Sequence, residues 1–242
     1  EGSSVVLTTS TGSGYVYTWF IDGVEIAGAK SASFSASKTG SYTVRIATPS
    51  GCESTSAAFR VTINPLPTAD VTVTGPTQFC AGESVQFRAA SGSGYKYQWL
   101  RNGSTIAGAT SATYVATLAG LYTVVVTDAN QCSNTSSAIT VTVEQAPTAA
   151  IEPPATTRLC TGASVTLKAV EGAGLTYQWR LDGRNIDGAT TSTLNVSTAG
   201  SYGLVVTNQF GCSSVSPLVR ITNVPYPSAT ITVDGPTALC PG

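Results

Sequence analysis

The chain has 242 residues, of which only 10% are charged, and its 12 Lys and Arg nearly balance its 13 Asp and Glu. It contains no histidine, which removes the commonest general base and the commonest metal ligand. A near-neutral charge without a basic run argues against binding to nucleic acid or to an anionic membrane surface. No apolar stretch approaches the roughly 20 residues that a spanning helix needs, so we expect no membrane insertion.

The sequence repeats itself at a fixed interval. Trp19, Trp99 and Trp179 are separated by steps of 80 residues. Internal repetition at such a period indicates an array of similar structural units, and three copies account for the whole chain. The same step relates Tyr42, Tyr122 and Tyr202, and it divides the cysteines into two series, Cys52, Cys132, Cys212 and Cys80, Cys160, Cys240.

Each copy is expected to consist of β-strands, as the second copy illustrates. Val85, Phe87 and Ala89 alternate with polar residues, which is typical of a half-buried strand. Asn102-Gly103 follows an aromatic segment and predicts a tight hairpin, because both turn residues need positive φ. Further strands are expected at residues 97–100, 113–117, 122–127 and 137–143.

This order of features resembles an immunoglobulin domain from its second strand, B, to its sixth, F. Trp99 stands where the core tryptophan of strand C is found, and Tyr122 stands where the tyrosine of the E–F corner is found. The resemblance implies that the tryptophan and the tyrosine of every copy lie in its core. The usual inter-sheet disulfide is absent, because its two positions hold Val44, Val124 or Leu204 and Thr9, Ala89 or Ala169.

We therefore expect an all-β protein made of tandem immunoglobulin-like β-sandwiches in a head-to-tail array. Proline-bearing junctions make stiff connectors. Strands of about eight residues at ~3.3 Å per residue would let each repeat lengthen the array by about 30–40 Å. The expected organisation is repeat 1 at residues 1–66, without its first strand, repeat 2 at 67–146, repeat 3 at 147–226, and a first strand of a following repeat, or a donated strand, at 227–242.

The cysteines stand outside the usual immunoglobulin positions. Cys80-Ala81-Gly82 precedes strand B of repeat 2, and a second cysteine follows strand F in each copy. This pattern resembles the immunoglobulin-like repeats of giant secreted surface proteins of Bacteroidota. Those proteins are typically exported by the type IX system and act in adhesion, gliding or surface scaffolding. The resemblance implies an extracellular or cell-surface location.

Six cysteines in a weakly charged chain favour disulfides over thiol chemistry. A zinc site is disfavoured, because the chain has neither Cys-x-x-Cys nor histidine. One pairing would lie within a repeat and join Cys80 to Cys132 and Cys160 to Cys212. The other would cross a junction and join Cys80 to Cys212. Both stay open, and the parallel course of strands B and F favours the second, since it puts the two cysteines of one repeat at opposite ends.

The phase of the repeat leaves two interpretations of the termini. The chain opens with Glu1-Gly2-Ser3-Ser4, without the features of a signal peptide, and it closes at Cys240-Pro241-Gly242. Repeat 1 is thus expected to lack strand A, and residues 228–242 to form a strand A without a body. Either three periods come from a longer protein, or this segment completes the first repeat of a neighbouring chain by strand donation.

No group of residues predicts catalysis. Asp22 and Asp182 recur as turn residues, and Lys30, Lys38 and Lys96 share no repeat position, which argues against an internal isopeptide bond. Phosphate-loop, calcium-loop and dinucleotide motifs are absent. We expect no enzymatic activity, no cofactor and no metal.

Three functions fit these features. The first is a structural segment of an extracellular fibre, filament or adhesin stalk. The second is a glycan- or protein-binding module, in which Tyr15 and Tyr95 could stack on a sugar. The third is an accessory region of a secreted enzyme. Short loops of nearly equal length favour the first. The expected partners are neighbouring repeats of the same or an identical chain, with a surface glycan or protein as the alternative.

Overall fold

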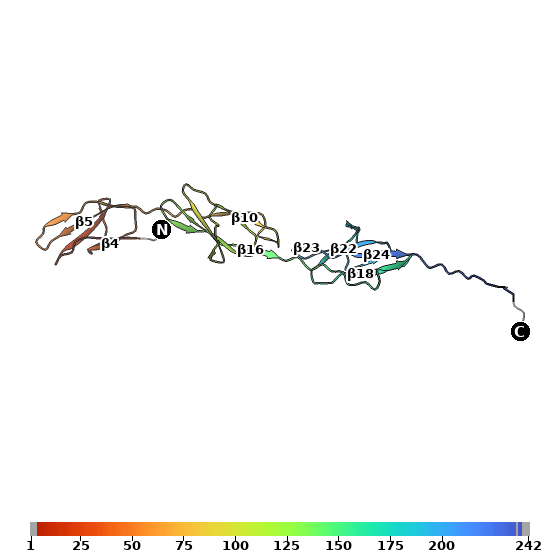
Figure 1. Ribbon diagram of the computed structural model, residues 1–242. Helices are drawn as coiled ribbons and strands as arrows, with labels where there is room; N and C mark the ends of the chain where they lie inside the picture. Colours follow the sequence, from red (N-terminus) through yellow and green to blue (C-terminus); the bar gives the residue numbers. More distant parts are fainter. Residues whose placement is uncertain (1–3, 236, 239–242) are drawn as a thin grey trace. The chain divides into compact units, whose positions relative to one another are not determined.

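The computed structural model describes residues 4–235, 237 and 238, in which the regular elements are β-strands (Figure 1). The expected all-β fold of immunoglobulin-like sandwich repeats is confirmed. The chain divides into two compact units, one of residues 1–72, 87–114 and 121–139 and one of 73–86, 115–120 and 140–242. The units do not follow the 80-residue period, and the expected repeat boundaries stay a prediction.

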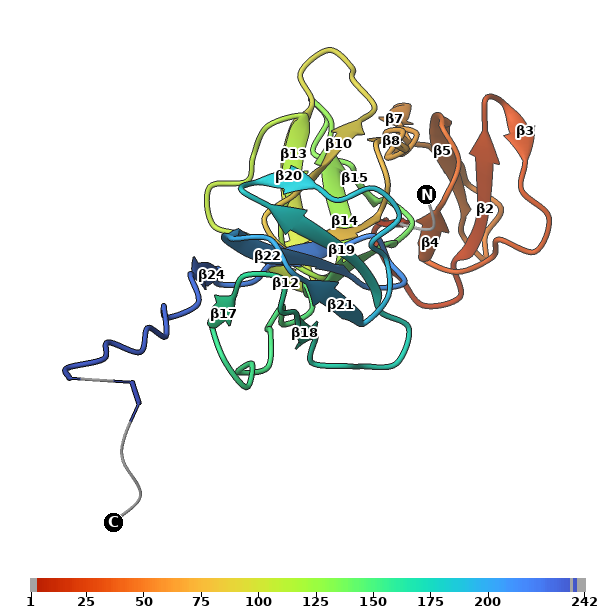
Figure 2. The same cartoon turned by 90° about the vertical axis from the view of Figure 1, so that its right-hand side faces the viewer.

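The first repeat forms two sheets in the first compact unit. In one sheet β1 pairs antiparallel with β4, and the other has the order β3-β2-β5-β6, with β7 also paired to β5. Figure 2 shows β2, β3 and β5 side by side. The strands are β1 Val5–Thr8, β2 Val16–Ile21, β3 Val24–Glu25, β4 Ser33–Ala36, β5 Gly40–Ala47, β6 Glu53–Thr55 and β7 Phe59–Val61.

The third repeat, in the second compact unit, has the same design with one strand more. β18 pairs with β21, and the larger sheet has the order β17-β24-β22-β19-β20, with β23 also paired to β22 (Figure 2). β17 runs parallel to β24. The strands are β17 Arg158–Cys160, β18 Val165–Lys168, β19 Thr176–Leu181, β20 Arg184–Asn185, β21 Thr193–Val196, β22 Gly200–Thr207, β23 Ser213–Val215 and β24 Val219–Val224.

The second repeat contributes to both compact units. In the first unit β11 pairs with β12 and β14, and β14 pairs with β15. In the second unit β9 runs parallel to β16, as β17 does to β24. The strands are β8 Val71–Thr74, β9 Gln78–Cys80, β10 Val85–Ala89, β11 Lys96–Arg101, β12 Ser104–Thr105, β13 Thr113–Ala116, β14 Gly120–Thr127, β15 Ser133–Thr135 and β16 Ile139–Glu144.

The hairpin turns have the backbone that their sequences predict. Asp182 has a φ of 49° and Gly183 a φ of 81°, as a two-residue turn with both residues at positive φ requires. Asp182 Oδ1 also accepts the N–H of Ser201 at 2.8 Å, so the turn is tied to the next long strand. Position 200 of this strand requires glycine, because a Cβ there would lie 2.4 Å from Leu181 Cδ1.

The three tryptophans are buried, and each indole N–H is satisfied. Trp19, Trp99 and Trp179 donate their Nε1–H groups to the backbone oxygen twelve residues later, each at 2.9 Å. A buried indole needs such a partner, since an unpaired polar group in the core costs about 1–3 kcal/mol. In the third repeat Trp179 packs with Leu167 of one sheet and Leu204 of the other, so the core lies between the two sheets.

The tyrosines at the E–F corner are also buried. Tyr42 and Tyr202 donate their hydroxyls to the backbone oxygens of Lys38 and Thr198, each at 2.9 Å. This bond to a residue four positions earlier fixes the turn that leads into β5 or β22, as in other tyrosine corners. Burial, and then the charge of Asp182, raises the pKa of Tyr202.

The last strand of each repeat is broken, which the sequence did not predict. In the third repeat the two parts are β23 and β24, and both pair with β22. Ser216 lies at the break and is buried. Its hydroxyl accepts the N–H of Leu204 at 3.0 Å and donates to the oxygen of Pro217 at 2.9 Å. The side chain therefore supplies a hydrogen bond that the interrupted ladder cannot.

Replacing Ser216 by Ala should leave the Leu204 N–H buried without its acceptor. We expect the free energy of unfolding of the second compact unit to fall by about 1–3 kcal/mol. Hydrogen exchange measured on peptides that cover β22 should become faster. Ser213→Ala is the control, because that serine is exposed and bonds only to the Thr207 hydroxyl. It should change stability by less than about 0.5 kcal/mol. Equal exchange in the two variants would contradict the assignment.

Candidate functional site at the repeat junctions

Cys80, from the series Cys80, Cys160 and Cys240, lies at the junction between repeats 2 and 3. Cys80 ends β9, which runs parallel to β16 and places Cys80 opposite Glu144. The Ala81 N–H donates to the Glu144 oxygen at 2.8 Å, and the Cys80 N–H donates to Glu83 Oε2 at 3.0 Å. The cysteine is thus held at the end of the last strand of repeat 2, beside the linker that follows it.

The series Cys52, Cys132 and Cys212 lies in the short loop after the longest strand of each repeat. Cys212 stands between β22 and β23, and its N–H donates to Asn208 Oδ1 at 3.0 Å. The same Asn208 donates from Nδ2 to the oxygen of Gln145 at 2.9 Å, and the Ser214 hydroxyl donates to the oxygen of Pro147. The loop of repeat 3 therefore rests on the linker that precedes that repeat.

A disulfide joins these two places. Cys80 and Cys212 are bonded, with their Cα atoms 5.5 Å apart and 132 residues between them along the sequence. The bond lies in the second compact unit and links repeat 2 to repeat 3. The pairing across a junction is confirmed for this pair. The pairing within a repeat, Cys80 with Cys132 and Cys160 with Cys212, is wrong, because Cys80 and Cys212 are bonded to each other.

The remaining described cysteines are free. Cys52 and Cys132 occupy the repeat position of Cys212, and Cys160 occupies that of Cys80. Cys52 and Cys160 are exposed, Cys132 is partly buried, and Cys240 lies outside the described residues. The loop around Cys52 has the same form as the loop around Cys212. The Cys52 N–H donates to Thr48 Oγ1 at 3.1 Å, and its oxygen accepts the Thr48 N–H at 2.9 Å.

The junction between the first two repeats shows a related contact. Asn134 Nδ2 donates to the oxygen of Pro67 at 2.9 Å, within the first compact unit. Asn134 and Ser214 differ by one period, as do Pro67 and Pro147. A polar side chain after the cysteine loop therefore binds the linker proline oxygen at both junctions.

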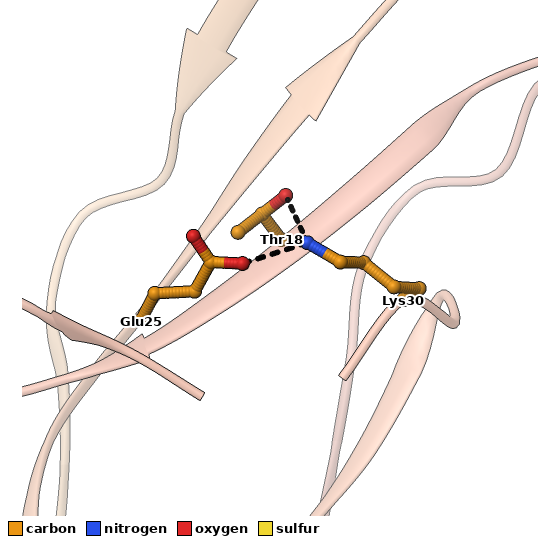
Figure 3. Close-up of polar contacts among 3 residues, drawn as sticks. All are labelled: Thr18, Glu25 and Lys30. Carbon is orange, nitrogen blue, oxygen red and sulfur yellow. Dashed lines mark hydrogen bonds and ion pairs between the residues drawn. The ribbon is translucent and has the colours of Figure 1, made fainter. Parts of the chain in front are cut away.

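The lysine nearest a carboxylate forms an ordinary ion pair. Lys30 Nζ lies 2.8 Å from Glu25 Oε1 and 3.3 Å from Thr18 Oγ1 (Figure 3). The hydrogen bond from Lys30, and then its charge, holds the pKa of Glu25 below its ordinary value. Both side chains are about half exposed, so the pair contributes little to stability. It occurs only in repeat 1, since Thr105 and Thr110 stand at the equivalent sites of repeat 2.

The tyrosines considered for sugar stacking lie over turns. A Cβ on Gly12 would meet the ring of Tyr15 at 2.4 Å, and one on Gly92 would meet Tyr95 at 2.5 Å. The rings therefore pack on the backbone of the preceding turn, although part of Tyr15 stays exposed.

Between residues 4 and 238, position 236 excepted, no three His, Cys, Asp or Glu side chains gather closely enough to hold a metal ion. No helix in that part of the chain is long and apolar enough to cross a membrane.

The first repeat contains an open cleft of ≈ 300 Å³. It lies along β1 and reaches the core residues Trp19, Tyr42 and Val44. Val5, on this edge, is 43% exposed, whereas Val85 at the equivalent position of repeat 2 is 1% exposed. The edge of the first repeat is thus an exposed apolar surface.

Comparison with known proteins agrees with repeats of this kind. The PKD domain family matches residues 68–143, which is the second repeat. The "Highly immunogenic outer capsid protein" of Enterobacteria phage T4 is 29% identical in an alignment that covers 86% of this chain. The alignment covers 64% of that protein, so the chain spans less than two thirds of its length.

Two solved structures illustrate what this chain is similar to. An I-band fragment of titin is 15% identical, with a TM-score of 0.48, and the match covers 92% of this chain and 93% of the fragment. Extracellular domains 3–5 of Drosophila OTK are 16% identical, with a TM-score of 0.38, covering 93% of this chain and 92% of theirs.

Removing the junction disulfide should destabilise the second compact unit. Cys212→Ala opens a loop of 132 residues, and loop-closure entropy predicts a loss of about 5 kcal/mol. Calorimetry should therefore record a lower Tm for that unit. Cys132→Ala is the matched control, because Cys132 occupies the same loop position in repeat 2 and is free. A Tm that is equal in the two variants would show that the bond does not stabilise the fold.

Proposed function

We propose that this chain is a non-catalytic structural segment of an extracellular fibre, filament or adhesin stalk. The observation that carries the proposal is the bond between Cys80 and Cys212, which connects consecutive repeats rather than the two sheets of one repeat. A bond at this place strengthens an array and gives nothing to an isolated domain. Disulfides also persist in oxidising compartments, which supports a location outside the cell.

The bond has a mechanical consequence that suits a stalk. When the chain is pulled from its ends, tension passes through the disulfide, and the 132-residue segment that it closes cannot extend. At ~3.4 Å per residue, that segment would otherwise lengthen the chain by about 450 Å on unfolding. A protein at a surface under flow or traction gains resistance to overstretching from such a bond.

The loops give less support to the alternative function, a module that binds a glycan or a protein. The cysteine loops of repeats 1 and 3 hold their backbones in the same way. Polar side chains beside the cysteine loops of repeats 2 and 3 bind linker oxygens. These groups are occupied within the chain and are not available to a ligand. The relative from phage T4 is described as an outer capsid protein, and we infer that this chain is likewise displayed on a surface.

The cysteine pattern supports a more specific origin. Cys80-Ala81-Gly82 and Cys160-Thr161-Gly162 resemble motifs in type IX-exported surface proteins of Bacteroidota, and we infer that the chain belongs to a protein of that kind. Its role would then be adhesion, gliding or surface scaffolding, with these repeats as the shaft.

Deleting one period from the native protein tests the structural role. Removal of residues 67–146 should leave a fibre that is shorter by about 30–40 Å, because each repeat adds its own length. Electron microscopy of the purified native and shortened proteins measures this difference. A parallel glycan and protein array with the 242-residue chain should give no ligand. Discrete particles that bind one ligand, with binding lost in Tyr15→Ala, would instead identify a recognition module.

A further inference from the structure

The junction disulfide divides the chain into a loaded part and an unloaded part when tension is applied to its two ends. Cys80 ends β9, and Cys212 stands just before β23. A pull that reaches Cys80 therefore crosses directly to Cys212 and leaves along β23 and β24. Residues 81–211, which include β10 to β22, lie between the bonded cysteines and carry no tension. The cores of repeats 2 and 3 are thus shielded from the load while the bond is intact.

The shielded segment holds a large reserve of length. The Cα atoms of the two bonded cysteines are only 5.5 Å apart, although 132 residues separate them along the sequence. At ~3.4 Å per residue, an extended segment of that size spans about 450 Å. Almost all of this length would be gained if the bond were broken and the two repeats then unfolded under load. The state of one bond therefore decides whether the reserve can be used.

Other contacts hold the same junction and do not depend on the disulfide. Asn208 Nδ2 donates to the oxygen of Gln145 at 2.9 Å, and the Ser214 hydroxyl donates to the oxygen of Pro147. Cys212 Sγ lies 4.0 Å from the Glu144 oxygen, which can accept the proton of a free thiol. The loop of repeat 3 therefore keeps its partners on the linker when the bond is reduced, whereas resistance to extension is lost.

The two sulfur atoms of the bond differ in their access to solvent. Cys212 is 1% exposed, whereas Cys80, at the end of β9, is partly exposed. The rate of thiol–disulfide exchange depends on which sulfur is attacked and on whether the attacking thiolate can reach it. An external thiolate is therefore expected to attack Cys80 and to displace Cys212.

We propose that the Cys80–Cys212 bond is a redox switch on the extensibility of this chain, and that a dithiol reductant opens it. In the oxidised chain residues 81–211 cannot extend. In the reduced chain repeats 2 and 3 bear the load, unfold and lengthen the array. The inference rests on the proposed stalk function, because extensibility matters only in a chain under tension.

The reduction takes place in two exchange steps. One thiolate of the dithiol attacks Cys80 Sγ and forms a mixed disulfide, the Sγ–Sγ bond breaks, and the Cys212 sulfur leaves as a thiolate that takes up a proton. The second thiol of the reductant loses its proton and attacks the first sulfur of the reductant. This step closes a cyclic disulfide and releases Cys80, which is protonated in turn. The protein gains two electrons and two protons, and the dithiol loses the same number.

The experiment is single-molecule force spectroscopy of the 242-residue chain, held at its two ends before and after addition of dithiothreitol. The fully extended chain should be longer by about 450 Å after reduction, at ~3.4 Å per residue. The unfolding events of repeats 2 and 3 should appear only then. Repeat 1 lies outside the bonded segment, so its unfolding event should occur in both states and serves as the internal reference.

Two variants separate the bond from other effects of the reductant. Cys212→Ala should reach the longer extension without dithiothreitol. Cys132→Ala is the matched control, because Cys132 is free, and it should behave like the unaltered chain. If Cys212→Ala does not fold, reduction of a single molecule that was folded and oxidised at the start still provides the comparison. With glutathione as the thiol, rapid alkylation and peptide mapping should find the mixed disulfide on Cys80, and a mixed disulfide on Cys212 would overturn the assignment of the attacked sulfur.

Equal extended lengths before and after reduction would overturn the proposed switch. If both lengths are short, the bond resists the reductant, and the chain is a permanently locked stalk, so that the proposed function stands. If both lengths are long, the bond does not carry the load in the oxidised chain. The stalk role itself is decided separately, by the length of the fibre after removal of residues 67–146.

Discussion

The bond between Cys80 and Cys212 ties repeat 2 to repeat 3. Immunoglobulin domains commonly place a disulfide between their two sheets, but here those positions hold residues other than cysteine, of which Leu204 is fully buried beside Trp179. The core of each repeat is held by packing and by hydrogen bonds such as that of the tryptophan indole. The covalent bond lies instead at the junction, where it stabilises the connection between repeats.

A core without a disulfide and a junction with one suit a chain of small repeats. A sandwich of about 80 residues buries a modest core and is only marginally stable alone. The linker contacts of Asn134 and Ser214 and the disulfide add stability that depends on having a neighbour. Stability therefore resides in pairs of repeats, as in other linear arrays.

Local features were predictable from the sequence, whereas contacts between distant segments were less so. Asn102-Gly103 and Asp182-Gly183 predicted their turns because positive φ is a property of the residues themselves. The partner of Cys80 required an argument about topology, since spacing alone allowed Cys132 as well as Cys212. The break at Ser216 was missed, because a hydroxyl that replaces a ladder bond has no local signature. Its recurrence as Ser56 and Ser136 was the one available signal.

A non-reducing peptide map of the native protein would show directly whether the disulfide crosses the junction between repeats. The material is alkylated, digested without reduction and analysed by mass spectrometry, so that each cysteine is found either blocked or joined to its partner. A disulfide across the junction predicts a peptide pair that contains Cys80 and Cys212. A pair that contains Cys80 and Cys132 would contradict it, because the bond would then lie within a repeat and would no longer join one repeat to the next.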